Sequence, residues 1–194
     1  MRHTILAIAL LISFPLLYQA QENSKAPLPL KISILDESLT LPNFWFTRYS
    51  YNPAAIIGTE FILKEKEKQD WHLTANLGFY YHKDWQAAVF LNSEIGYRYH
   101  FGRFNAAARL GLGYAHVFAT QPIYREEDGD YVAAKDYGSP ALMPSLGLSL
   151  AYELQEKEYS PEVFLTFMSQ GEVPFNFFTG LHQLVGLGVK FYPF

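Results

Sequence analysis

The amino-acid sequence predicts an all-β protein: an eight-stranded antiparallel up-and-down transmembrane β-barrel whose lumen is filled by side chains. Three observations support this fold class. Apolar and polar residues alternate in segments of about ten residues from Leu41 onwards, which is the pattern of strands with one apolar and one polar face. An apolar segment of the export type precedes them. The last segment, 184–194, alternates to its end and stops on the aromatic Phe194.

The first 20 residues have the pattern of a secretory signal peptide. Arg2 precedes an apolar run from Thr4 to Leu17 and the small residue Ala20 follows, so we expect cleavage after Ala20. The run is too short to span a bilayer comfortably as a helix. No helical span is expected in the rest of the chain, because the mean hydropathy of the whole sequence is only −0.03.

The composition restricts the class of protein. With 49% hydrophobic and 18% charged residues, the chain forms one folded domain rather than a disordered segment. Aromatic residues make up 17%, which fits two girdles at the membrane interfaces. The absence of cysteine excludes disulfides. The net charge of −4, about −5 once Arg2 is removed, argues against nucleic acid as a partner.

The chain after the signal divides into a lead-in and a barrel. Residues 21–40 contain Pro27 and Pro29 and are expected to form a periplasmic lead-in, within which 31–41 fits either a short helix or an extra strand. The barrel is expected over 41–194. Its eight predicted strands are 41–50, 54–64, 71–81, 87–99, 104–118, 143–154, 162–168 and 184–194.

The lengths of the connections agree with this topology. An even number of strands places both ends of the barrel on the periplasmic side. The connections then assigned to the periplasm, 65–70, 100–103 and 155–161, are short, whereas the two longest, 120–142 and 169–183, are assigned to the outside. Short periplasmic turns and long outer loops are the asymmetry expected of such barrels.

The predicted strand 87–99 separates its side chains by face. Val89 and Leu91 point to the side expected to meet lipid, and Glu94 and Arg98 point to the lumen, because successive side chains leave opposite faces of a strand. The same alternation collects three acids and three bases in the lumen: Glu60, Glu94, Glu153, Arg98, Arg109 and Lys190.

These lumen charges are expected to pair, because an unpaired buried ion costs several kcal/mol. An eight-stranded barrel has room inside only for its own side chains. The charge network is therefore interpreted as a packing plug, with a gated path for small ions as the alternative. The spacing indicates no pair of carboxylates of the catalytic kind beside a substrate cleft.

The sequence indicates no metal or cofactor site. The histidines after the signal fall in different strands or turns, and none are at the short spacings of zinc or copper sites. His82, His116 and His182 are all expected near the outer rim, so a cluster with acidic loop residues stays an alternative. The acidic stretch 125–130 lacks the terminal glutamate of a calcium loop and is interpreted as a solvated turn.

The whole mature chain resembles the small outer-membrane β-barrel proteins of Gram-negative bacteria. The resemblance is carried by the signal, the eight alternating segments, the loop asymmetry and Phe194. The stretches 76–82 and 91–99 resemble segments of barrel proteins of this kind that are described only as uncharacterised. The resemblance implies the fold and a location in the cell outer membrane, and it implies no activity.

A fainter likeness is to lipid A deacylase-type barrels. That family carries His-x-Ser-Asn near the rim of a late strand. The corresponding stretch here is 167–171, Phe-Met-Ser-Gln-Gly, in which only Ser169 matches and Phe167 occupies the position of the base. A serine without a neighbouring imidazole is not an activated nucleophile, so His182 would have to approach Ser169 across the intervening loop. Ser169 and His182 are the weak catalytic candidates.

We interpret the chain as a structural or surface-interaction protein without evident catalytic activity. Its expected partners are outer-membrane lipid and lipopolysaccharide, the barrel-assembly machinery during insertion, and an extracellular partner bound by the loop 120–142. A lipid-modifying hydrolase at the outer rim and a narrow channel are the alternatives for function. A soluble β-sandwich, whose antiparallel sheets also alternate, is the alternative for the fold.

Overall fold

The computed structural model describes residues 27–40, 51–127, 129–155, 159–175 and 178–193. The predicted signal peptide and Phe194 lie outside these ranges. The described strands are β1 (Leu30–Thr40), β2 (Pro53–Lys66), β3 (Gln69–Tyr81), β4 (Gln86–Phe101), β5 (Phe104–Ala119), β6 (Ile123–Glu127), β7 (Asp130–Ala134), β8 (Ser139–Glu153), β9 (Glu162–Phe175) and β10 (Phe178–Phe191).

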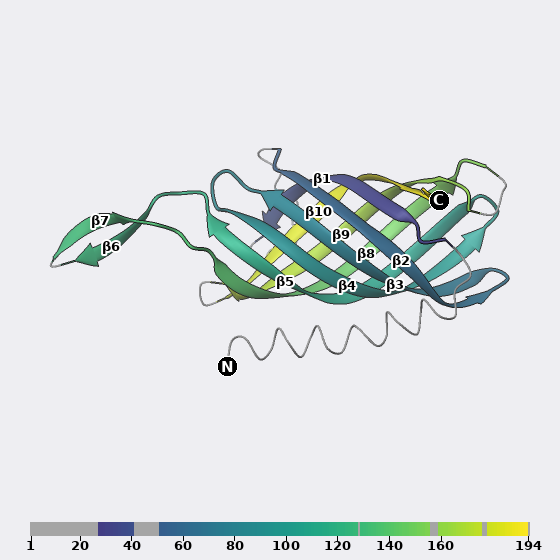
Figure 1. The fold of residues 1–194 in the computed structure, drawn as a ribbon, viewed down its shortest axis with the longest axis horizontal. Coiled ribbons are helices and arrows are strands. Elements are labelled where there is room, and N and C mark those ends of the chain that lie inside the picture. Colours follow the sequence, from purple (N-terminus) through teal and green to yellow (C-terminus); the bar gives the residue numbers. More distant parts are fainter. Residues whose placement is uncertain (1–26, 41–50, 128, 156–158, 176–177, 194) are drawn as a thin grey trace.

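Eight of these strands form a closed antiparallel barrel in the order β1-β10-β9-β8-β5-β4-β3-β2. β6 and β7 form a separate two-stranded sheet, which stands away from one end of the barrel (Figure 1). We call this the hairpin end and the opposite end, where β4 turns into β5, the turn end. Within the described residues, no helix is long and apolar enough to cross a membrane. The fold class that the sequence predicts is confirmed.

The first barrel strand lies earlier in the chain than predicted. Residues 31–41, which fit a helix or a strand, fall in β1 as far as the structure describes them, and β1 pairs with both β2 and β10. The lead-in predicted over 21–40 is therefore wrong for the part that forms β1. The segment 41–50, predicted as the first strand, lies outside the described residues. Leu35 is 1% exposed inside the barrel and Ile34 is 67% exposed outside, so apolar residues on both faces obscure the alternation.

The outer loop predicted over 169–183 is also wrong, because β9 and β10 extend into it from both sides. Its polar residues suggest a loop when only the sequence is considered. In the structure Gln170, Glu172 and His182 are buried within the barrel. The other predicted outer loop, 120–142, contains the β6–β7 hairpin and the first residues of β8.

The barrel wall separates apolar from polar side chains as the alternation predicts. On β4, Val89 and Leu91 are 45% and 56% exposed, whereas Glu94 and Arg98 are buried. On β5, Leu110 is 64% exposed. Large apolar side chains exposed on the outside of a closed barrel match a lipid environment, in which every backbone polar group must be paired within the protein.

An apolar layer crosses the lumen between two groups of polar side chains. Along β10, the inward side chains change from His182 at the hairpin end, through Leu184, to Lys190 at the turn end. The apolar layer consists of Leu35, Phe90, Met143, Met168 and Leu184, which belong to one buried cluster. The lumen is thus filled over its middle part by side chains that do not attract water.

Candidate functional site

The lumen on the turn side of the apolar layer holds four acids and four bases, which we call the turn-side network. Its members are Glu60, Asp70, Glu94, Glu162, Lys31, Arg98, Arg109 and Lys190. They come from β1, β2, β3, β4, β5, β9 and β10, so the network ties the barrel together across its interior. Its formal charges balance, as a group of ions inside a membrane protein requires.

Arg98 is the centre of this network. Its Nε lies 2.7 Å from Asp70 Oδ2 and its Nη2 lies 3.1 Å from Asp70 Oδ1, so the guanidinium holds that carboxylate with two hydrogen bonds. The same Nη2 donates to Glu60 Oε1 at 2.6 Å. Two-pronged pairing of this kind is the strongest form of arginine–carboxylate contact.

Two lysines complete the charge balance around Glu60. Lys31 Nζ lies 3.3 Å from Glu60 Oε2, and Lys190 Nζ lies 3.7 Å from Glu60 Oε1. Lys190 also forms an ion pair with Glu162, which accepts a hydrogen bond of 3.2 Å from Asn105 Nδ2. Each carboxylate of this group therefore has a basic partner.

Arg109 forms a second centre nearer the middle of the barrel. Its guanidinium donates to Glu94 Oε2 at 3.2 Å, to Ser149 Oγ at 2.9 Å and to Thr166 Oγ1 at 3.1 Å. Ser145 Oγ donates to the other Glu94 oxygen at 2.9 Å. Small polar residues on β8 and β9 thus satisfy the charges that the ion pair alone leaves without partners.

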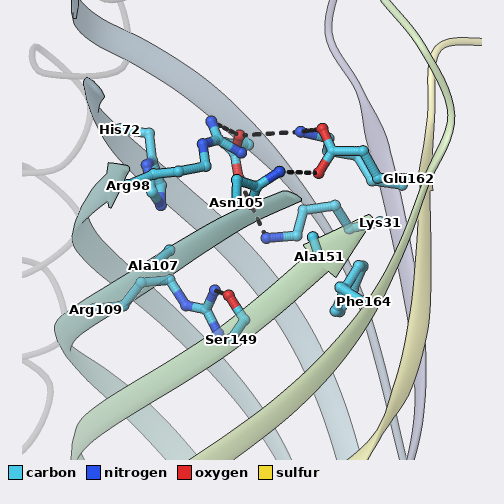
Figure 2. A pocket seen from close by; sticks show the side chains of 12 residues that line it. Lys31, His72, Arg98, Asn105, Ala107, Arg109, Ser149, Ala151, Glu162 and Phe164 are labelled. Atoms are coloured by element: carbon cyan, nitrogen blue, oxygen red, sulfur yellow. Dashed lines mark hydrogen bonds and ion pairs between the residues drawn. The ribbon is translucent and has the colours of Figure 1, made fainter. Parts of the chain in front are cut away.

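A cavity of about 20 Å³ remains among these side chains. Figure 2 shows Lys31, Arg98 and Arg109 directed into this region, with Ser149 and Glu162 beside them. A cavity needs roughly 10–15 Å³ to hold one water molecule, so this one has room for about one. The space is a small gap among packed, paired side chains.

Five of the six charged residues predicted for the lumen lie there: Glu60, Glu94, Arg98, Arg109 and Lys190. Glu153 lies opposite Glu162 at the rim and, among the described residues, reaches the network only through His100, whose Nε2 lies 2.8 Å from Asp70 Oδ2. The Glu153 side chain is 26% exposed at the turn end, 3.8 Å from His100 Nδ1, because β8 ends at this residue. The sequence analysis missed Lys31 with β1, and it missed Asp70, which lies just outside the predicted strand. Glu162 was detectable, because it shares the inward alternation of Phe164 and Thr166.

The lumen at the hairpin end contains a smaller group, the hairpin-side cluster, built around His182. Its Nδ1 lies 2.8 Å from Glu37 Oε1 and its Nε2 lies 3.1 Å from Glu172 Oε2. Only a ring protonated on both nitrogens can donate to both carboxylates. Gln86 Nε2 donates to Glu172 Oε2 at 2.5 Å and to Tyr80 Oη at 2.9 Å. The cluster joins β1, β3, β4, β9 and β10.

The structure does not bring the two catalytic candidates together. Met168 and Gln170 are buried in the lumen, so Ser169 between them projects from the outer face of β9. His182 is buried inside the barrel, where its ring nitrogens contact carboxylates. The wall of the barrel therefore separates the Ser169 hydroxyl from the imidazole, and no hydrogen bond joins the serine to a base among the residues that the structure describes.

The described part of the chain contains no group of three or more histidine, aspartate or glutamate side chains arranged to hold a metal ion. At the hairpin end, His116 instead lies 3.0 Å from Tyr114 Oη and 3.0 Å from the carbonyl oxygen of Tyr137. His82 has its backbone bonded to Gln86 in the turn between β3 and β4. The rim histidines therefore contact neighbouring strands and loops.

The β6–β7 hairpin is the most exposed part of the described barrel chain. Its strands pair only with each other, from Ile123 opposite Ala134 to Glu127 opposite Asp130. Every described side chain of β6 and β7 before Ala134 is exposed. Gly129 in the turn has a φ of 89°, which a glycine adopts without strain and which suits a tight hairpin.

The base of this hairpin is held by hydrogen bonds to one acidic residue. Asp136 Oδ2 accepts from the backbone N–H of Ala119 at 2.5 Å, and its Oδ1 accepts from the N–H of Gly138 at 2.8 Å. Residues before Asp136 can therefore change without removing the contacts that begin β8.

Comparison with known proteins relates the chain to others through its fold. No protein-family model matches it, and neither does any curated protein. Among solved structures, Neisserial surface protein A (NspA) aligns with a TM-score of 0.53 and 6% identity over 85% of this chain and 95% of that one. The fold is that of the small outer-membrane β-barrels. The outer membrane enzyme PagL aligns with a TM-score of 0.50 and 9% identity over 84% of this chain and 98% of that one.

This small outer-membrane β-barrel has the architecture that the sequence resemblance implies. The fold and the apolar outer surface agree with the predicted location in the outer membrane. At identities of 6% and 9% the likeness concerns the fold alone, so neither comparison transfers a substrate or a partner.

Proposed function

We propose that this chain is a surface-interaction protein of the outer membrane, in which the barrel is the anchor and the β6–β7 hairpin makes the contact. The observation that carries the proposal is the contrast between the two parts. The lumen is packed and the charges of its turn-side network balance, whereas the hairpin extends beyond the barrel (Figure 1) and its side chains are exposed. In the predicted orientation, the hairpin end faces outwards.

The channel alternative has less support. A conducting barrel needs a continuous water path, and the apolar layer lies across the lumen beside a cavity for about one water molecule. The hydrolase alternative also has less support, because Ser169 and His182 leave opposite faces of the barrel wall. Outer-membrane lipid, lipopolysaccharide and the assembly machinery remain the proposed surroundings of the barrel itself.

The test replaces residues 123–134 by a Gly/Ser linker of equal length and keeps Asp136. Both chains are refolded into detergent, and a shift of gel mobility on boiling verifies the barrel. Vesicles carrying each chain are then tested for binding to three immobilised surfaces: a basic protein, an acidic protein and a neutral polysaccharide. We expect the wild-type chain to bind at least one surface and the linker variant, although folded, to bind none.

The proposal is overturned if the linker variant binds every surface as the wild type does. It is equally overturned if the wild-type chain binds none of them and instead releases fatty acid from lipopolysaccharide or conducts ions. Release of fatty acid that is lost in the Ser169→Ala variant would favour the hydrolase.

A further inference from the structure

We propose that the β6–β7 hairpin receives an extended, cationic peptide segment of a partner protein, which adds as a third strand beside β7. This inference rests on the proposed function and specifies the partner. Three properties of the hairpin support it: an exposed tyrosine face, a strand edge that pairs with no other described strand and is uncharged over residues 131–134, and a net negative charge.

The tyrosine face follows from the register of the two strands. Tyr124 is opposite Ala133 and Glu126 is opposite Tyr131, so these four side chains lie on one face of the sheet. Tyr124 is 60% exposed and Tyr131 is 75% exposed. Two aromatic rings on adjacent strands, with a carboxylate directly across from one of them, form a surface suited to a cationic side chain.

Neither ring has a cation or another ring against it within the described residues. Tyr137, just beyond the hairpin, is different, because Lys135 Nζ lies 5.5 Å from the centre of its ring. The chain thus supplies its own cation to Tyr137 and leaves Tyr124 and Tyr131 available. This difference makes Tyr137 a control position for the test below.

The edge of β7 is the more accessible of the two free edges. The sheet has only two strands, so each has one side whose backbone groups pair with no other strand of the described chain. β6 carries three consecutive charged residues, 125–127, and follows Pro122, features that protect an edge from strand addition. Residues 131–134 of β7 are Tyr-Val-Ala-Ala and carry no charge. A two-stranded ribbon is also marginally stable by itself and gains from a third strand.

The charge of the hairpin selects the chemistry of the added strand. Residues 123–134 contain four acids, Glu126, Glu127, Asp128 and Asp130, and one base, Arg125, for a net charge of −3. Such a segment repels lipopolysaccharide phosphates and nucleic acids and attracts lysine or arginine. Backbone pairing with β7 supplies affinity, and a cation near Tyr131 and Glu126 supplies specificity.

The test uses the full chain refolded in non-ionic detergent and a fluorescent ten-residue peptide that alternates Lys and Thr. Two matched peptides serve as controls: one alternates Glu and Thr, and the other is the Lys–Thr peptide with alternate backbone nitrogens methylated. Fluorescence anisotropy measures Kd. We expect the Lys–Thr peptide to bind, the Glu–Thr peptide not to bind, and backbone methylation to weaken binding at least tenfold.

Substitutions on the hairpin test the face. Tyr124→Ala and Tyr131→Ala should each raise Kd about two- to fivefold, the effect expected for losing an exposed cation–π contact. Tyr137→Ala should leave Kd within the error of the measurement. Gel mobility with and without boiling shows that each variant is folded.

Equal binding of the Lys–Thr and Glu–Thr peptides overturns the inference, as does undiminished binding of the methylated peptide or of the Lys–Thr peptide to the linker variant. Failure of the inference is distinguishable from failure of the proposed function. If the hairpin is required for binding the acidic protein or the polysaccharide while the Lys–Thr peptide does not bind, the partner class is wrong and the surface-interaction role stands.

Discussion

The His182 imidazole on β10 lies 2.8 Å from the Glu37 carboxylate on β1, across the seam at which the first and last strands close the barrel. The two residues are 145 positions apart in the chain. On the other side of the ring, Glu172 holds the second nitrogen at 3.1 Å. A buried side-chain contact therefore bridges the closing seam of the barrel in addition to backbone pairing.

His182→Leu should lower the free energy of unfolding by about 3–5 kcal/mol, because it leaves Glu37 and Glu172 buried without a positive partner. The measurement is the urea midpoint of the folded gel band in detergent. His116→Leu, at the rim of the same end, is the matched control and should change the free energy by less than about 1 kcal/mol. Similar losses in the two variants would contradict a special role for the seam contact.

Arg98→Met should also destabilise the barrel by about 3–5 kcal/mol, since Asp70 and Glu60 both lose their closest basic group. Arg103→Met is a suitable comparison. Arg103 donates to the backbone carbonyls of Glu153 and Leu154 at the turn end, and losing these bonds should cost about 1–2 kcal/mol. Urea titration monitored by intrinsic tryptophan fluorescence measures both. If Arg98→Met unfolds at the wild-type midpoint, the turn-side network is not a structural plug.

Gly78 is required by the close approach of an aromatic ring. It is opposite Phe90, and a Cβ atom at Gly78 would overlap the Phe90 ring. Gly78→Ala should therefore destabilise the chain by about 1–3 kcal/mol through overpacking. Adding Phe90→Leu should recover part of that loss, because the smaller side chain leaves room for the methyl group. Additive losses in the double variant would show that the ring is not the cause.

The apolar outer surface predicts that a charged substitution costs more folding free energy in the middle of the membrane than near its surface. Leu110 lies within β5, opposite Ile95 and Leu146, and is 64% exposed. Leu110→Arg should cost about 2–4 kcal/mol in lipid vesicles, and Leu154→Arg, just past the end of β8, about 0–1 kcal/mol. Folding equilibria in vesicles measure both values. Equal penalties would argue against a membrane-spanning orientation of the barrel.

The alternation of side chains was sufficient to predict β2 to β5 and β8 and the inward position of most lumen charges. The prediction failed where an inward side chain is apolar, and where the polar inward side chains of a strand have the composition of a loop. In β1, Leu35 faces the lumen beside the outward Ile34, so no clean period of two appears. In β9 and β10, the polar residues Glu172 and His182 suggest a loop when only the sequence is considered. In the structure both are buried inside the barrel.

Which residues meet in the lumen depends on how the strands close into a barrel. A local sequence pattern cannot specify this. Glu37 meets His182 only because β1 pairs with β10 in one register. Likewise, the separation of Ser169 from His182 depends on which face each residue takes once β9 and β10 extend through the predicted loop. The hairpin within 120–142 has the Asp-Gly turn signal of its sequence, but its position beyond the barrel is a property of the whole fold.

Ion conductance across a planar bilayer tests the central claim, that the barrel is closed and its function lies outside the lumen. The refolded wild-type chain is added to a bilayer, insertion is verified by gel mobility of recovered protein, and an open porin serves as the positive control. We predict no stable conductance steps, because the apolar layer and the paired charges leave no water path. Reproducible ohmic steps from the wild-type chain, altered by Arg98→Ala, would contradict the account and identify a channel.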